Sequence, residues 1–159
     1  MANSNNLEQS VQSLPLQSYY NSENFNDELK AIWQKEWIYT CHEKSIKDPL
    51  DFITLKISNY NIVILRDKNN QIVAYLNTCR HRGSILCEEE SGKLKNNLLV
   101  CKYHQWSYNA SNGNLVRTSS FEVPSNFNPE EHALEKVQLK IWNGLVFVNL
   151  DNEAKWNTE

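Results

Sequence analysis

At 159 residues, with 40% hydrophobic and 22% charged side chains, the chain has the length and composition of one globular domain with its own core. A formal net charge of −3 provides no basic surface for nucleic acid, and no run of about eighteen apolar residues could span a membrane. Residues 1–6 have neither the basic start nor the apolar core of a secretory signal. We therefore expect a cytoplasmic protein with reduced thiols, and neither nucleic acid nor a membrane among its partners.

The first predicted element is a helix that follows a polar tail. Residues 1–17 are rich in Asn, Ser and Gln, and we expect them to be disordered. Asn21 or Ser22 can cap a helix that runs through about Lys35. Apolar residues recur there at the spacing of one helix face, which we expect to pack against the core: Phe25, Leu29, Ile32, Trp33 and Trp37.

From residue 52 the apolar pattern changes to that of strands joined by tight turns. Strands are expected at 52–57, 60–65, 72–76, 97–101, 106–108, 115–117, 137–142 and 145–150, with turns at 58–59, 67–70 and 109–114. Asn143-Gly144 is a strong signal for a type I′ hairpin, and Gly113 is expected at positive φ. The charged run 88–93 is expected to be an exposed connector. These features predict an all-β, antiparallel domain with one N-terminal helix.

Two short segments concentrate the residue types that bind metals. They read Cys79-Arg80-His81-Arg82-Gly83 and Cys101-Lys102-Tyr103-His104-Gln105-Trp106. Each offers one thiolate and one imidazole, in the pattern C-x-H, nineteen residues, C-x-x-H. A Rieske [2Fe–2S] centre needs two Cys on one iron and two His on the other. Cys79 and Cys101 would then hold one iron, while His81 and His104 would hold the second.

Zinc is the main alternative for these four ligands, because a Cys₂His₂ set also suits tetrahedral Zn²⁺. Zinc fingers usually pair like with like, whereas each segment here mixes Cys with His, which favours the iron–sulfur cluster. A site without any metal also stays open. The other two cysteines, Cys41 and Cys87, are expected to be small buried hydrophobic residues.

The surroundings of the four ligands resemble the Rieske domain of ring-hydroxylating (Rieske non-haem iron) oxygenase large, or alpha, subunits. The resemblance covers about residues 20–151 and includes the closing segment Trp142 to Asp151. It implies a Rieske-type antiparallel β sandwich at 18–151, with a small cluster-binding subdomain at about 77–108 and a C-terminal tail at 152–159.

The resemblance also implies a function. The cluster would take electrons from a reductase or ferredoxin and relay them to a mononuclear iron for O₂-dependent hydroxylation of a small organic substrate. That Fe(II) belongs to a catalytic domain, in the family that of a neighbouring subunit in a trimer. His42 and His132 lack the spacing for such a site, so we expect no catalytic residue here. The chain is expected to be the redox part of a mono- or dioxygenase, as a fragment or a solitary domain. A stand-alone Rieske ferredoxin-like carrier, and a zinc-bound or metal-free β binding module, stay open.

Six further residues are expected around the cluster: Arg80, Arg82, Gly83, Tyr103, Gln105 and Trp106. The two arginines would either orient a carboxylate of a partner or pair with local acids such as Glu88. Tyr103 and Trp106 would shield the cluster from water. Gln105 stands where the family normally has Gly, which predicts a strained position that costs about 1 kcal/mol or more.

The respiratory type of Rieske protein differs from this sequence at three positions. Ser84 and Tyr103 stand where that type has an extra pair of Cys, so its disulfide cannot form. Trp106 stands where that type has a hydroxyl donor to the cluster sulfur. Fewer hydrogen bonds to sulfur predict a reduction potential at the low end of the Rieske range of roughly −150 to +300 mV.

Overall fold

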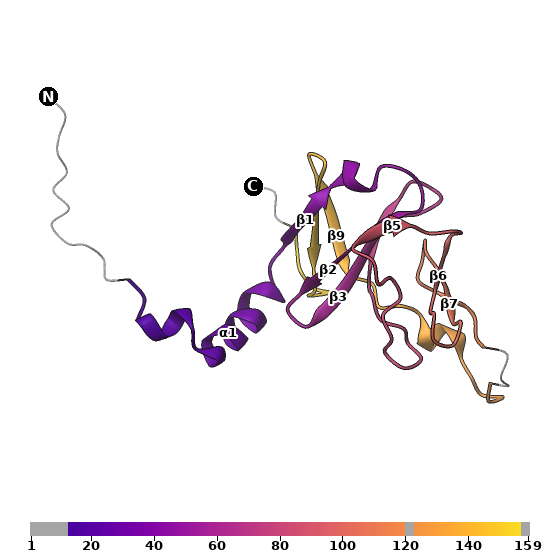
Figure 1. Cartoon of the computed structure of the whole chain (residues 1–159), viewed down its shortest axis with the longest axis horizontal. Coiled ribbons are helices and arrows are strands. Elements are labelled where there is room, and N and C mark those ends of the chain that lie inside the picture. The colour runs from indigo at the N-terminus through magenta and orange to yellow at the C-terminus, as the bar shows by residue number, and fades with distance from the viewer. Residues whose placement is uncertain (1–12, 120–122, 157–159) are drawn as a thin grey trace, which may run out of the picture.

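The computed structural model of the chain describes residues 13–119 and 123–156. A helical N-terminal arm projects from a β body, and strands β6 and β7 lie at the end of the molecule opposite to helix α1 (Figure 1). The strands are β1 (Ile38–His42), β2 (Asp51–Ile57), β3 (Tyr60–Arg66), β4 (Ile72–Leu76), β5 (Ser91–Lys93), β6 (Leu98–Val100), β7 (Ser107–Asn109), β8 (Leu115–Arg117), β9 (Gln138–Trp142) and β10 (Leu145–Asn149). The helical segments are a 3₁₀ turn at Leu16–Tyr19, α1 (Ser22–Glu28), a π-helical turn at Leu29–Trp33, and 3₁₀ turns at Glu43–Ile46 and Pro129–His132.

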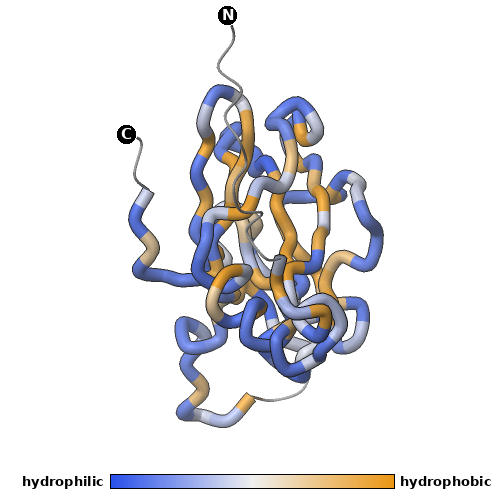
Figure 2. The backbone as a smooth tube through the Cα atoms, turned by 90° about the vertical axis from the view of Figure 1, so that its left-hand side faces the viewer, coloured by the Kyte–Doolittle hydropathy of each residue, from blue (hydrophilic) through white to orange (hydrophobic). Residues whose placement is uncertain are grey.

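The strands form three antiparallel sheets. Their orders are β1-β10-β9, β4-β3-β2-β5 and β6-β7-β8. Strand β3 is covered on both faces because successive side chains point to opposite sides of a sheet. Ile62 and Ile64 enter the core shared with β1 and β10, whereas Val63 and Leu65 enter the core shared with the β6-β7-β8 sheet. Figure 2 shows apolar stretches of backbone in the body of the molecule, joined by mostly hydrophilic connections.

The sequence predicted most strands and turns correctly. The 52–57 and 60–65 strands correspond to β2 and β3, and the 72–76 strand is β4. Asn143 and Gly144 have φ of 49° and 80°, as the type I′ hairpin requires. Gly113 has a φ of 81°, and a Cβ atom there would lie 2.8 Å from the ring of Tyr75. These turns therefore fix the pairing of the strands that they join.

Two strands were missed by the sequence analysis. Ile38–His42, which follows the predicted helix, forms β1 and pairs with β10. A bulge between Tyr39 and Cys41 interrupts its alternation, which hides the strand pattern. The expected connector at 88–93 was wrong at its end, since Ser91–Lys93 forms β5 and pairs with β2. As an exposed edge strand, β5 has no apolar face to identify it.

The helix begins as predicted but does not pack as predicted. Asn21 caps α1 by accepting a hydrogen bond from the backbone N–H of Glu23 at 2.7 Å. The expected burial of the apolar helix face is wrong: Phe25, Ile32 and Trp33 are 56, 48 and 43% exposed. The arm points away from the body, so no described strand covers that face (Figure 1). None of the described helices is long and apolar enough to cross a membrane.

The two ends of the domain are fastened to each other. Lys35 forms an ion pair of 2.8 Å with Asp151, and the buried Asn149 donates a hydrogen bond to the carbonyl of Lys35. Trp156, in the expected C-terminal tail, packs edge-on against Trp37 at a ring distance of 5.0 Å. Most of the expected N-terminal tail, residues 1–12, lies outside the described residues.

Candidate metal centre

The two predicted ligand segments form loops with the same hydrogen-bond scheme. In the first loop, the N–H of Cys79 donates to the carbonyl of Ser84 at 2.8 Å, and the N–H of Gly83 donates to the carbonyl of Cys79 at 2.9 Å. In the second loop, the N–H of Cys101 donates to Trp106 and the N–H of Gln105 donates to Cys101, at the same two distances. The fourth residue after each cysteine has positive φ.

That shared position explains the unusual glutamine of the second loop. Gly83 has a φ of 72° and Gln105 has a φ of 62°. Both lie in the left-handed region, which favours glycine. The structure thus confirms the predicted backbone conformation at Gln105, and it identifies Gly83 as the residue in the equivalent place of the first loop.

The loops bring the four predicted ligands together in two pairs. Cys79 and Cys101 are each only 2% exposed and belong to one buried cluster. The Nδ1 atoms of His81 and His104 lie 3.1 Å apart, and their rings are half-buried. The thiols therefore lie inside, whereas the imidazoles form the edge of the site that faces the surface.

The imidazole pair suits a single metal. Two nitrogens bound about 2.1 Å from one metal at a tetrahedral angle lie about 3.4 Å apart. The 3.1 Å between the Nδ1 atoms is close to that separation. Within residues 13–119 and 123–156, no three His, Cys, Asp or Glu side chains form a group that could hold one metal ion. The imidazoles of His81 and His104 form one close pair and the thiols of Cys79 and Cys101 form another, the grouping that two irons with two protein ligands each would use.

The protein environment favours the neutral forms of His81 and Cys79. Burial lowers the pKa of the His81 imidazole from its ordinary 6.5, and the nearby His104 lowers it further. The neutral imidazole is the form that binds a metal. Burial raises the pKa of the Cys79 thiol; a hydrogen bond with Tyr108 opposes this rise and the neighbouring Cys101 adds to it.

Aromatic rings lie against both histidines. Trp106 stacks on His81 with the rings 4.6 Å apart and 9° from parallel, and Tyr103 stacks on His104 at 3.8 Å. Trp106 is 6% exposed and covers the ring of His81. Tyr103 is 60% exposed and covers His104 from the surface side, so its role in shielding a cluster stays a prediction. Beside Trp106, His132 helps to line a cavity of about 420 Å³ that both His81 and His104 border.

The charges around the site are paired differently from the expectation. Arg80 forms an ion pair with Glu135, and Glu88 pairs with Lys102 rather than with an arginine. Among the described residues, no carboxylate lies within ion-pair distance of Arg82, which is exposed. Within the part of the chain that the structure describes, Arg82 is thus a cation without an ion-pair partner, next to His81 in the sequence.

Two residues that the sequence analysis missed contact the first loop. The hydroxyl of Tyr108 lies 3.2 Å from the Sγ of Cys79 and accepts the backbone N–H of Arg80 at 3.0 Å. Tyr108 is completely buried, and burial raises the pKa of its hydroxyl. It therefore keeps its proton and can donate it to a thiolate. The second missed residue, Asn77, hydrogen-bonds the backbone of Leu86 and Cys87.

Paired loops with two thiols and two imidazoles, at the end of an antiparallel β body, define an iron–sulfur class of protein. Residues 36–128 match the family model of the Rieske [2Fe-2S] domain, and the chain belongs to this family.

Proteins named as oxygenase subunits are among its relatives. The chain is 34% identical over 138 residues to the 2-aminobenzenesulfonate 2,3-dioxygenase subunit alpha of an Alcaligenes species, covering 86% of this chain and 34% of the relative. It is 34% identical over 142 residues to the carnitine monooxygenase oxygenase subunit of Acinetobacter pittii (strain PHEA-2), covering 89% and 38%. The chain thus spans little more than a third of the length of these curated relatives.

A solved structure shows the same fold. It is a quaternary ammonium Rieske monooxygenase, described for carnitine oxidation by gut microbiota and for inter-subunit electron transfer. The match has a TM-score of 0.81 and 31% identity, and it covers 92% of this chain and 43% of the other. The fold is therefore a mostly β, antiparallel Rieske oxygenase domain with one helical arm.

Proposed function

We propose that this chain is the electron-transfer domain of a Rieske oxygenase. Cys79 and Cys101 would hold one iron of the [2Fe–2S] cluster, and His81 and His104 would hold the other. The observation that carries the proposal is the pair of Nδ1 atoms 3.1 Å apart beside two buried thiols. The names of the relatives support the oxygenase context.

The buried and the half-buried residues of the site would have different roles in electron transfer. When bound, the cluster supplies one-electron oxidation and reduction. The buried cysteines and Trp106 keep water from the inner side of the site. The half-buried His81 and His104 form the side that a partner can approach. Electron exchange is therefore expected through the histidine edge.

Arg82 would help to recognise the partner at that edge. It is exposed and free of a described carboxylate, whereas the charge of Arg80 is neutralised by Glu135. A partner with a carboxylate can therefore pair with Arg82 while it contacts the histidines. The partner would be the oxygenase catalytic domain of a neighbouring subunit, with a reductase or ferredoxin as electron donor.

The whole oxygenase would hydroxylate a small organic molecule with O₂ at a mononuclear Fe(II) in its catalytic domain. The two relatives are named for 2-aminobenzenesulfonate and carnitine, so both aromatic and quaternary ammonium substrates are compatible. All four cysteines are free thiols, which suits a cytoplasmic location.

Metal analysis of anaerobically purified protein tests the ligand assignment. We expect about two irons and two labile sulfides per chain, with a Rieske-type EPR signal after reduction. Cys79→Ser should abolish the signal, whereas Cys87→Ser, at a buried thiol outside the four ligands, should keep it. One zinc per chain, or full iron content in Cys79→Ser, would contradict the proposal.

A further inference from the structure

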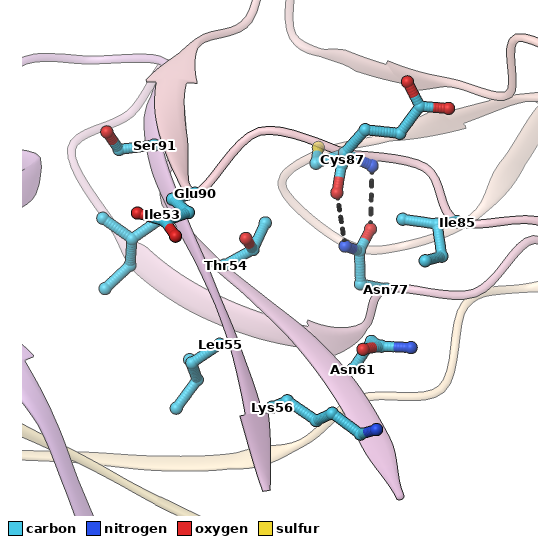
Figure 3. Close-up of a pocket in the computed structure, with 11 residues that line it drawn as sticks. Ile53, Thr54, Leu55, Lys56, Asn61, Asn77, Ile85, Cys87, Glu90 and Ser91 are labelled. Atoms are coloured by element: carbon cyan, nitrogen blue, oxygen red, sulfur yellow. Dashed lines mark hydrogen bonds between the residues drawn. The ribbon is translucent and has the colours of Figure 1, made fainter.

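Asn77 is a buried polar residue directly before the first ligand loop (Figure 3). It follows the last residue of β4 and is 2% exposed. Its backbone N–H donates to the carbonyl of Asn61 on β3 at 2.8 Å. Asn77 is therefore fixed to the four-stranded sheet before the chain enters the loop.

The side-chain amide of Asn77 spans the two ends of that loop. Its Oδ1 accepts the backbone N–H groups of Leu86 at 3.2 Å and Cys87 at 2.9 Å. Its Nδ2 donates to the carbonyl of Cys87 at 2.7 Å, and Figure 3 shows the amide directed at that backbone. Both bonded residues are buried, so water cannot readily replace these hydrogen bonds.

The second ligand loop is closed by strand pairing rather than by a side chain. It is flanked by β6 and β7, which pair directly at Val100 and Ser107, one residue outside Cys101 and Trp106. The first loop leaves β4, but no strand follows it until β5, which pairs with β2 instead. One residue outside the first loop, Thr78 and Ile85 form an isolated bridge that no strand pairing extends.

We propose that Asn77 is a positioning residue of the metal centre. Its amide closes the base of the first loop in the way that strand pairing closes the second. It thereby places Cys79 and His81 opposite Cys101 and His104. This inference rests on the ligand set proposed above, and it assigns Asn77 no contact with the cluster itself.

The test compares Asn77→Ala with Asn149→Ala in the iron-loaded protein. Asn149 is a matched control: it is 1% exposed, donates to a backbone carbonyl at 2.8 Å and accepts a backbone N–H at 2.7 Å, but lies beside the N-terminal arm. Iron release to a chelator is followed together with the melting temperature. Losing these hydrogen bonds should speed iron release about tenfold or more in Asn77→Ala. Asn149→Ala should lower the melting temperature similarly with less than about a twofold change in release.

Each outcome decides one of the two proposals. Equal iron-release rates in Asn77→Ala and Asn149→Ala would overturn the positioning role while the cluster assignment stands. A wild-type protein that takes up no iron would overturn the ligand assignment, and the positioning role with it. Should Asn77→Ala fail to fold, amide exchange in the wild-type holoprotein decides. Slow exchange at Leu86 and Cys87 supports the closure. Exchange as fast as at the exposed Lys95, whose N–H has no hydrogen-bond partner among the described residues, refutes it.

Discussion

Replacing Gln105 with glycine should stabilise the protein, because the backbone at this position disfavours every other residue type. Its φ of 62° costs an L-residue about 1–2 kcal/mol. Glycine also increases the conformational freedom of the unfolded chain, which lowers the free energy of unfolding by about 0.4–1 kcal/mol. The side chain makes only an exposed hydrogen bond of 3.3 Å to the carbonyl of Lys102, which water can replace.

The net gain in the free energy of unfolding is about 0.5–1 kcal/mol. For a chain of this length, that gain corresponds to a rise of about 1–4 °C in melting temperature. Thermal unfolding followed by circular dichroism, on samples matched for iron content, measures the change.

The structure offers two matched controls for this substitution. Gly83 has the equivalent conformation, and a Cβ atom there would meet nothing within 4 Å, so Gly83→Gln adds backbone strain without a clash. It should lower the melting temperature by about the amount that Gln105→Gly raises it. Gln105→Ala removes the side-chain hydrogen bond but keeps the strained backbone, and it should melt close to the wild type. An unchanged or lower melting temperature in Gln105→Gly would refute the strain argument.

Three further predictions follow from buried contacts. Tyr108→Phe removes a hydrogen bond of 3.2 Å to Cys79, a proposed ligand, and should lower the reduction potential by about 20–60 mV in a potentiometric titration. An unchanged potential would mean that the hydroxyl does not act on the sulfur. Gly113→Ala places a Cβ atom 2.8 Å from the Tyr75 ring at a φ of 81°. It should lower the free energy of unfolding, measured in urea, by about 2–4 kcal/mol. A decrease below about 1 kcal/mol would show that the ring moves aside freely. Burial would raise the pKa of the Asp67 carboxyl, but hydrogen bonds from Ser111 and from backbone N–H groups outweigh it and hold the pKa below the ordinary 3.8. The ionised carboxylate therefore stabilises the fold above pH 3.8 and loses this effect as the pH falls through the lowered pKa. The difference in melting temperature between wild type and Asp67→Asn should shrink below about pH 4. A difference that is constant from pH 3 to 7 would contradict this.

The sequence predicted the features that depend on residues close together in the chain. Asn143-Gly144 specifies its hairpin because both residues tolerate positive φ. The two ligand segments were visible because each holds a Cys and a His within four residues. The comparison with the family also pointed to Gln105, and its positive φ bears that out.

The contacts that the sequence could not predict join residues that are distant in the chain. Tyr108 reaches Cys79 across 29 positions, and Glu135 reaches Arg80 across 55. Neither partner has a local pattern that separates it from an ordinary strand or loop residue. The packing of the arm was mispredicted for a related reason: an apolar helix face such as that of Trp33 shows that a face exists, but not what covers it.

The two ligand loops share one hydrogen-bond scheme but differ in where they are weak. The second loop carries the strain of Gln105 and is closed by the pairing of β6 with β7. The first loop is unstrained at Gly83, but its base depends on the amide of Asn77. Relief of strain in a loop that is already closed should raise the melting temperature with little effect on iron release.

Loss of the Asn77 amide should instead speed iron release as well as lower the melting temperature, because it frees one pair of the proposed ligands while the strand pairing of the body persists. The two changes act on different loops, so their effects on the free energy of unfolding should add within about 0.5 kcal/mol in the double variant Asn77→Ala, Gln105→Gly. Iron release from that variant should stay as fast as from Asn77→Ala alone. If Gln105→Gly restored the slow iron release of the wild type in this variant, the two loops would instead open as one unit.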